Sequence, residues 1–369
     1  MGQTFELNDE LINSVLSTAL GEDSARVLSF KTKALKAGAG NPTSLGVYRV
    51  WGTATTASGE APFSVVVKHL ADGNPVIDSS EPQNWNYWLR EIVFFESSLV
   101  AKIPAALGYP LYLGSSNLPD GTALFWNEDL GDLEDNNWTW AKCLQAAELV
   151  AELNSIKIDE AEQFVWFNTT QMQTWHDFMP WWPQRHAAVV ERARLEKNAA
   201  LTKDFELIAP FIENRGLIMQ LVASTPKVFA HGDFNLNNLV TRDDGSNRII
   251  ALDWQLCGLA PVATEVAAIF NTAHELAVVE ATLEQFNEIC AVYFETFKRI
   301  TPQTTVTLDD VKRVAAAMGI FILGGMGYYY LSPDGELRWP ESEKPIDEFL
   351  ARAVAGPLLT YAKVLKDLV

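Results

Sequence analysis

The sequence predicts an α+β fold of two unequal parts, a small antiparallel sheet followed by a larger, mainly helical region. Runs rich in β-branched and aromatic residues, separated by Gly, Pro, Asn and Ser, occupy the chain up to about residue 128. Beyond Gly131, apolar residues recur at helical spacing instead. A chain of 369 residues with 48% hydrophobic content is long enough to form two lobes around a sizeable core.

The first part opens with a helix and continues with strands. Asp9–Leu20 repeats apolar positions at helical spacing after Asn8, which is typical of a capped helix. A second helix is expected over Trp85–Val100. The strand pattern appears in three runs before that helix and in two short segments after it: Ala34–Ala37, Ser44–Ala54, Phe63–Leu70, Tyr109–Gly114 and Thr122–Trp126. We therefore expect a small sheet with one packed helix.

The second part is expected to be mostly helical. Its helical patterns cover Ala141–Asn154, Lys203–Ser224, Glu265–Ala281, Leu283–Arg299 and Asp309–Leu331. No internal repeat and no low-complexity tract interrupts them. The boundary between the two parts is expected close to Glu128, which gives an N-terminal lobe of residues 1–128 and a C-terminal lobe of residues 129–369.

Composition excludes several classes of function. The net charge of -19 and the pI near 4.7 argue against nucleic acid and anionic membranes as partners, because binding either one needs a basic patch. Cys143, Cys257 and Cys290 lack metal-ligand spacing and fit reduced, buried thiols. The chain begins without a basic, then apolar, secretory pattern. We therefore expect a cytoplasmic protein.

One segment allows a different interpretation. Val314–Leu331 carries no charge over a length close to the lower limit for a membrane span, so a membrane-attached protein is one alternative. Its glycines and its acidic start at Asp309 and Asp310 favour a helix buried in a globular core instead.

The residues with the strongest chemical signal lie around a predicted hairpin. Asp233 and Asn238 precede its first strand, and Asp253 ends its second strand. Two carboxylates and one carboxamide around a polar cleft suit Mg²⁺, which prefers oxygen ligands. Phosphoryl transfer needs one carboxylate to take the proton of the acceptor hydroxyl, with an Asn and a second Asp to hold the metal. The alternative is that these side chains only cap turns. His231 is expected to bind backbone around the loop.

The segments HGDFNLNNLV and IIALDWQ resemble the catalytic loop and metal-binding strand of the aminoglycoside phosphotransferase and choline kinase-like superfamily. The resemblance covers about Gly38 to Ile269 and implies a protein-kinase-like fold, ATP as phosphate donor and Mg²⁺ as cofactor. It assigns catalysis to Asp233 and metal binding to Asn238 and Asp253. Lys68 then resembles the phosphate-binding lysine, and Glu91 the helix glutamate that pairs with it.

The resemblance also points to weaker nucleotide contacts. The loop from Gly38 to Gly46 would approach the triphosphate, with Thr43 and Ser44 as hydroxyl donors. In the segment LFWNEDLG, the main-chain groups of Asn127 and Asp129 would contact adenine, and Trp126 would form a wall of the adenine site.

Two positions depart from the family pattern. Glu265 stands where many relatives have Asp, and Asn154 where some have His. The protein-kinase landmarks HRD, DFG and APE are absent, which argues against a protein substrate.

The expected function is an ATP-dependent kinase that phosphorylates a hydroxyl of a soluble small molecule, such as an aminoglycoside, an amino alcohol or a sugar-like compound. A nucleotide-binding regulator that keeps the fold without phosphoryl transfer is the alternative.

Aromatic residues of the segment TWHDFMPWWPQR, with Tyr328–Tyr330 and Trp339, could line the acceptor pocket or simply pack on the core. The acidic residues Asp132, Glu134 and Asp135 either form a solvated acidic loop or attract an amine, so amino sugars and amino alcohols rank only slightly ahead of neutral sugars as acceptors.

Overall fold

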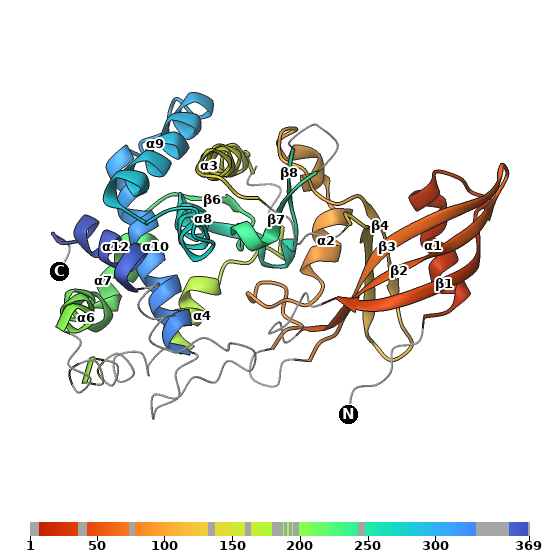
Figure 1. The fold of residues 1–369 in the computed structure, drawn as a ribbon, viewed down its shortest axis with the longest axis horizontal. Coiled ribbons are helices and arrows are strands. Elements are labelled where there is room, and N and C mark those ends of the chain that lie inside the picture. Colours follow the sequence, from red (N-terminus) through yellow and green to blue (C-terminus); the bar gives the residue numbers. More distant parts are fainter. Residues whose placement is uncertain are drawn as a thin grey trace.

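The computed structural model describes residues 7–35, 43–73, 78–131, 137–158, 164–178, 187, 190–191, 194, 199–242, 248–329 and 354–367. The fold has a sheet with one helix against it at one end and a larger group of helices at the other (Figure 1). The predicted α+β class, with an antiparallel sheet first and a helical region after it, is confirmed. The boundary predicted at residue 128 remains a prediction.

The N-terminal sheet has five antiparallel strands in the order β1-β2-β3-β5-β4. Their bounds are β1 Arg26–Leu35, β2 Ser44–Thr56, β3 Gly59–Leu70, β4 Tyr112–Asn117 and β5 Ala123–Glu128. Helix α1 (Asp9–Leu20) packs Ile12, Val15 and Leu16 against one face of this sheet, where they form a core with Val67 and Trp126. β2, β3, β4 and β5 overlap predicted strands, whereas β1 begins at Arg26 and meets the strand predicted over Ala34–Ala37 only at Ala34 and Leu35.

Helix α2 (Arg90–Glu96) is much shorter than the helix predicted over Trp85–Val100. On its N-terminal side, the Arg90 side chain binds the carbonyl groups of Trp85 and Asn84 and so holds this stretch as turns. On the C-terminal side, Ser97 adopts an extended backbone and its hydroxyl caps the 3₁₀ helix η1 (Ser98–Lys102). The predicted length was therefore wrong because side-chain contacts to the backbone outweigh helical periodicity.

Helix α2 also joins the two parts of the molecule. It lies between the sheet and the helical region (Figure 1). Its buried Phe94 and Phe95 belong to the large core that continues into the C-terminal helices. Phe94 stacks on Trp254 of the 3₁₀ helix η4 (Trp254–Leu256), with ring centroids 4.6 Å apart. Movement of α2 against the second part would therefore break a continuous apolar core.

The second part contains helices packed around two short two-stranded sheets. Its described helices are α3 Trp140–Asn154, α4 Gln171–Phe178, α6 Ala199–Glu213, α7 Arg215–Ala223, α8 Thr264–Glu275, α9 Leu283–Ile300, α10 Leu308–Tyr329, the π-helix η5 Val354–Leu358 and α12 Leu359–Val364. In the first two-stranded sheet, β6 (Lys227–Ala230) pairs with β9 (Gly258–Pro261), and in the second, β7 (Leu239–Thr241) pairs with β8 (Ile249–Ala251). The strands β6 and β9 were not predicted.

Two predicted helices end or break early. The helix predicted over Lys203–Ser224 is interrupted between α6 and α7 at Asn214, whose amide donates to the Pro210 carbonyl. The helix predicted to reach Ala281 stops at Glu275, and Ala277 and Ala281 follow with positive φ angles. Short polar or strained backbone positions thus ended helices that the apolar pattern continued.

Helix α10 contains the described part of the uncharged segment. Its residues Val314–Phe321 are buried in the large core, as expected for a core helix. Within the described part of the chain, no helix combines the length and the apolar run that crossing a membrane requires. The three cysteines are buried and form no disulfide.

Candidate active site

The predicted residues Lys68, Glu91 and Asp253 meet between the sheet and the helical region. Lys68, near the end of β3, places its Nζ 2.7 Å from Glu91 Oε2 and 3.0 Å from Asp253 Oδ1. Burial alone would lower the pKa of Lys68, but the carboxylates of Asp253 and Glu91 outweigh it and raise that pKa. The lysine is therefore held as a cation beside two acids.

Glu91 is fixed at both of its carboxylate oxygens. Oε2 accepts from Lys68, and Oε1 accepts from the backbone N–H of Trp254 at 3.1 Å. Only 2% of the residue is exposed. Glu91 thus connects the β3 lysine to the residue that directly follows Asp253.

Arg90 holds α2 in place beside this cluster, although no sequence pattern marked it. The residue is fully buried, and its guanidinium donates to backbone carbonyls on both sides of α2. These acceptors are the carbonyls of Pro82, Asn84, Trp85, Trp166 and Gln255. Burial lowers the pKa of Arg90 to about 10, so the side chain remains charged at neutral pH. An arginine on a short helix usually suggests a solvated surface, so only the folded chain reveals this role.

Asp253 stands at a left-handed backbone position. Its φ of 61° and ψ of 67° place the residue between β8 and η4, where L-residues are uncommon. The buried Trp254 and the Lys68 contact hold it there. Burial would raise the pKa of Asp253, but Lys68 lowers it, so the group stays a carboxylate. Its side chain is 35% exposed, which leaves oxygen accessible from the cleft.

Asp233 is held by two asparagine side chains on the loop between β6 and β7. Asn235 Nδ2 donates to Oδ1 and Asn238 Nδ2 donates to Oδ2, each at 2.7 Å. Asn238 also donates to the Asp233 carbonyl at 3.0 Å. Burial, together with the Asp253 charge, raises the pKa of Asp233 to about 6. The carboxylate is therefore oriented, and its pKa lies close enough to neutral pH for it to exchange a proton.

His231 binds backbone around this loop, as expected from the sequence. Its Nε2 lies 2.9 Å from the Leu252 carbonyl, and its Nδ1 accepts from the Asp233 N–H at 3.3 Å. A carbonyl can only accept, so Nε2 carries the proton and the ring is neutral. Burial lowers the pKa of His231 to about 4, which agrees with that state. The ring thus fixes the position of Asp233 relative to the end of β8.

Glu265 supports the loop from the first turn of α8. Its Oε1 accepts from the Gly232 N–H at 2.9 Å, and its Oε2 accepts from Asn154 Nδ2 at 3.3 Å. Asn154 in turn accepts from the Tyr293 hydroxyl at 2.7 Å. The two departures from the family pattern, Glu265 and Asn154, therefore contact each other.

The backbone conformation at position 232 requires glycine. Its φ is 87°, and a Cβ at this position would overlap the Leu256 carbonyl. Burial raises the pKa of Glu265 to about 7, against the opposing effect of the Gly232 hydrogen bond. Gly232 and Glu265 together set the path of the chain just before Asp233.

The predicted nucleotide contacts lie on the sheet side of this cluster. The hydroxyl of Ser44 is buried and has no partner among the described residues, whereas buried Thr43 accepts from Gln255 Nε2. Asn127 is buried on β5 opposite Val66, and its Oδ1 also has no described partner. The Asp129 carboxylate instead pairs with Arg49 at 2.8 Å. The structure therefore does not join the Asp129 side chain to the Lys68 cluster. Only the main chain of Asp129 is left to contact the base of a nucleotide.

Most residues predicted to line the acceptor pocket, and the acidic residues predicted to attract an amine, lie outside the described part. These are Asp132, Glu134, Asp135, Trp181, Trp182, Arg185, Tyr330 and Trp339, together with the side chains of Trp175, Asp177, Tyr328 and Tyr329. His176, in α4, is described and partly buried.

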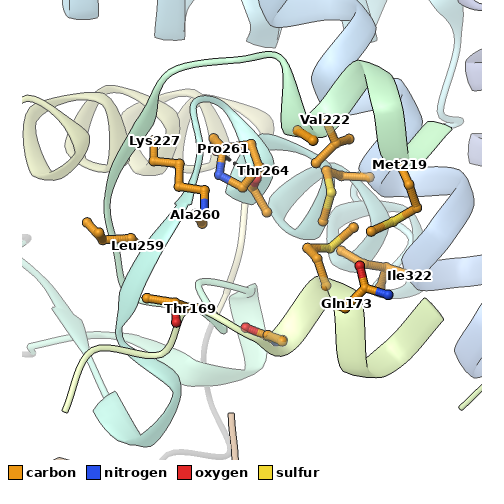
Figure 2. A pocket seen from close by; sticks show the side chains of 15 residues that line it. Thr169, Gln173, Met219, Val222, Lys227, Leu259, Ala260, Pro261, Thr264 and Ile322 are labelled. Atoms are coloured by element: carbon orange, nitrogen blue, oxygen red, sulfur yellow. Dashed lines mark hydrogen bonds between the residues drawn. The ribbon is translucent and has the colours of Figure 1, made fainter. Parts of the chain in front are cut away.

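A cavity of about 180 Å³ opens beside the Asp233 loop, and Gly232 forms part of its wall. Its other walls come from α4, α7, α10, β9 and the first residues of β6 and α8. Three methionines, Met172, Met219 and Met318, line it, and we call it the methionine cavity. Figure 2 shows Lys227 and Leu259 across this cavity from Met219 and Ile322. These segments are far apart in the sequence, so no local motif predicted the cavity.

Comparison with known families and structures agrees with the fold and with the predicted resemblance. Residues 129–296 match the sequence model of the phosphotransferase enzyme family. That range includes Asp233, Asn238, Asp253 and Glu265 but not Lys68 or Glu91. Comparison with curated proteins finds no match.

Solved structures with a similar fold cover nearly the whole chain. An aminoglycoside phosphotransferase from Alicyclobacillus acidocaldarius has a TM-score of 0.54 and 11% identity over 99% of this chain and 98% of its own. Ethanolamine kinase from Plasmodium vivax has a TM-score of 0.50 and 14% identity over 100% and 93%. Choline kinase from Cryptosporidium parvum has a TM-score of 0.50 and 15% identity over 98% and 96%. The predicted protein-kinase-like fold is thereby confirmed.

Proposed function

Because residues 129–296 match the phosphotransferase enzyme family, we propose that this phosphotransferase is a small-molecule kinase that uses Mg-ATP to phosphorylate a hydroxyl of its acceptor. Structures with the same fold are named for aminoglycosides, ethanolamine, choline and aminopropanol as substrates. A soluble hydroxyl compound is accordingly the proposed acceptor class. ATP is the proposed donor.

The observation that carries the proposal is the meeting of two groups of residues from distant parts of the chain. We call Lys68, Glu91, Asp233, Asn238 and Asp253 together the transfer centre. Lys68 contacts Glu91 and Asp253 within 3.0 Å, while Asn238 holds Asp233 at 2.7 Å. A cation for the phosphates, a metal-binding carboxylate and an oriented base are the parts that phosphoryl transfer requires.

Asn238 and Asp253 are suited to hold Mg²⁺ together with nucleotide phosphates. Among the described residues, no group of three or more His, Cys, Asp or Glu could form a cage made of protein alone. Mg²⁺ commonly takes one or two carboxylates plus phosphates and waters, and the partly exposed Asp253 fits that pattern. When bound, the metal would neutralise charge that develops on the phosphates.

Asp233 is proposed to take the proton from the acceptor. The hydroxyl oxygen forms a bond to the γ-phosphorus, the bond from that phosphorus to the bridging oxygen breaks, and the proton passes to an Asp233 carboxylate oxygen. The pKa of about 6 leaves this group mostly ionised at neutral pH and able to accept a proton. Lys68 would contact the phosphates that leave as ADP.

Acceptor-dependent release of ADP from Mg-ATP tests the proposal. Wild type and Asp233→Asn are compared across aminoglycosides, amino alcohols, sugars, nucleosides and neutral alcohols, with Glu213→Gln as an exposed control on α6. We expect at least one acceptor to stimulate ADP release in the wild type and in Glu213→Gln, and Asp233→Asn to lose it. Retained turnover in Asp233→Asn would contradict the role of this residue. ATP binding without release from any acceptor would support the nucleotide-binding regulator.

A further inference from the structure

The methionine cavity adjoins the residue that precedes the proposed catalytic base. Gly232, in its wall, is bonded directly to Asp233. The cavity therefore lies on the helical side of the transfer centre, away from the sheet that carries Lys68. A molecule that offers a hydroxyl to Asp233 from this side would place its remaining atoms against these walls.

The wall of the cavity is mainly apolar, and its polar side chains are Thr169, Gln171, Gln173, Lys227 and Thr264. Its apolar side chains include Met172, Met219, Val222, Met318 and Ile322. No Asp, Glu or aromatic residue occurs among the described residues that line it, and Lys227 is the charged side chain there. Ammonium groups are usually bound by carboxylates or by aromatic faces, and a lysine repels them. The described part of this wall therefore offers a cationic amine neither a carboxylate nor an aromatic face.

The size of the cavity suits a compact apolar group. An engineered apolar cavity of about 150 Å³ binds benzene in another protein. A cavity of about 180 Å³ can hold a six-membered ring or a branched alkyl group of similar volume. Methionine side chains adapt their shape to different apolar ligands, which allows related acceptors to fit.

We propose that the methionine cavity binds an uncharged, apolar part of the acceptor, a ring or a branched alkyl group, while the acceptor hydroxyl faces Asp233. This inference rests on the proposed kinase function. It differs from the slight preference for amine-bearing acceptors that the acidic residues after Gly131 suggested, and those residues lie outside the described part.

Direct binding can be measured without turnover by NMR of protein labelled with ¹³C at the methionine methyl groups. The signals of Met172, Met219 and Met318 are assigned with single Met→Leu variants. Benzyl alcohol is the neutral probe, and ethanolamine and choline are the cationic ones. We expect benzyl alcohol to shift the three signals in a saturable way and the cations to leave them unchanged. No shift with benzyl alcohol, or a stronger response to ethanolamine or choline, would overturn the inference.

A charge placed in the cavity wall tests the same inference through activity. Met219→Glu adds a carboxylate to the wall, and Gln220→Glu adds the same charge at the next, exposed residue of α7. We expect Met219→Glu to lower kcat/KM for neutral ring alcohols by about tenfold or more, because a carboxylate in an apolar site is strongly unfavourable. The KM for ATP should not change, and Gln220→Glu should behave as wild type. Equal kinetics in Met219→Glu and Gln220→Glu would contradict the inference.

The two experiments separate this inference from the proposed function. Saturable methionine shifts without ADP release from any alcohol would refute the kinase assignment while the apolar site remains. ADP release stimulated by ethanolamine or an aminoglycoside, but by none of the neutral alcohols, would support the kinase and overturn the apolar acceptor. Should Met219→Glu fail to fold, the wild-type NMR titration decides the question by itself.

Discussion

The transfer centre and the methionine cavity lie next to each other but are built in opposite ways. In the transfer centre, Lys68, Glu91 and Asp233 are each fixed by hydrogen bonds or ion pairs of 2.7 to 3.1 Å. The cavity is lined mainly by methionines and aliphatic side chains, which impose volume and no direction. The contrast suggests that the polar region fixes the reaction and the apolar region selects the acceptor.

This division implies different tolerance to mutation. Removing one partner from a buried polar network leaves the other partner unsatisfied, which is costly. Exchanging apolar residues of similar volume costs little. Substitutions in the transfer centre should therefore affect catalysis with every acceptor, and substitutions in the cavity should mainly change the ranking of acceptors.

The largest effect is expected from Lys68→Met. This variant removes the cation between Glu91 and Asp253 and leaves Glu91 buried without its partner. We expect kcat/KM to fall by about 100- to 1,000-fold with every acceptor, and the free energy of unfolding to fall by about 3 kcal/mol. ADP release and urea unfolding measure the two quantities. Lys203→Met, at an exposed position of α6, is the control. A loss in Lys68→Met that differs from one acceptor to another would contradict the separate roles of the transfer centre and the cavity.

Arg90→Lys should lower stability although the charge is kept. The lysine cannot reproduce a planar group that donates to carbonyls on both sides of α2. We expect a loss of about 3 kcal/mol in the free energy of unfolding, since several buried carbonyls lose their donor. The matched control is Arg313→Lys, whose exposed pair with Asp309 should be worth less than about 0.5 kcal/mol. Similar losses in both variants, measured by urea unfolding, would refute this role of Arg90.

Glu265 should make stability depend on pH. Its pKa rises from 4.5 to about 7 on folding, so the protonated form is favoured in the folded chain. The stabilisation is complete below pH 4.5 and is lost as pH rises through 7. Between pH 5 and pH 8 we expect Glu265→Gln to lose less stability than wild type, by about 2 to 3 kcal/mol.

Urea unfolding of wild type, Glu265→Gln and the exposed control Glu280→Gln at both pH values measures this difference. An identical pH dependence in wild type and Glu265→Gln would show that Glu265 does not titrate in this range.

The smallest effect is expected from Met318→Leu in the cavity wall. Met318 is 2% exposed, and the two side chains have similar volumes. We expect a change of less than about 1.5 kcal/mol in the free energy of unfolding. The KM for ATP should stay the same while the KM for a neutral ring alcohol changes several-fold. A loss of activity with all acceptors, measured by ADP release, would mean that the cavity also positions the transfer centre.

The sequence predicted β2 and β3 well because alternation and turn residues act over a few positions. β2 and β3 begin at or before the predicted residues and include them. Helix lengths were less predictable, since α2 is limited by Arg90 and Ser97, whose contacts are specific to the folded chain. Asn214, between α6 and α7, had a local signal that the apolar pattern concealed.

The candidate site was predictable in part for the same reason. Asp233, Asn238 and Asp253 lie within about twenty residues of one another, so their spacing could be seen in the sequence. The pairing of Lys68 with Glu91 was predicted from the order of motifs in the family that the sequence resembles. The methionine cavity combines α4, α7, β9 and α10, which only the tertiary structure brings together.

The central claim is that Asp233 takes the proton of an acceptor whose oxygen then carries the phosphate. ³¹P NMR of a reaction with Mg-ATP and the best acceptor found in the ADP-release assay tests it most directly. We expect wild type to convert the γ-phosphate signal of ATP into that of a phosphate monoester, and Asp233→Asn to bind ATP with unchanged affinity and form no ester. Ester formation by Asp233→Asn at the wild-type rate would contradict the account.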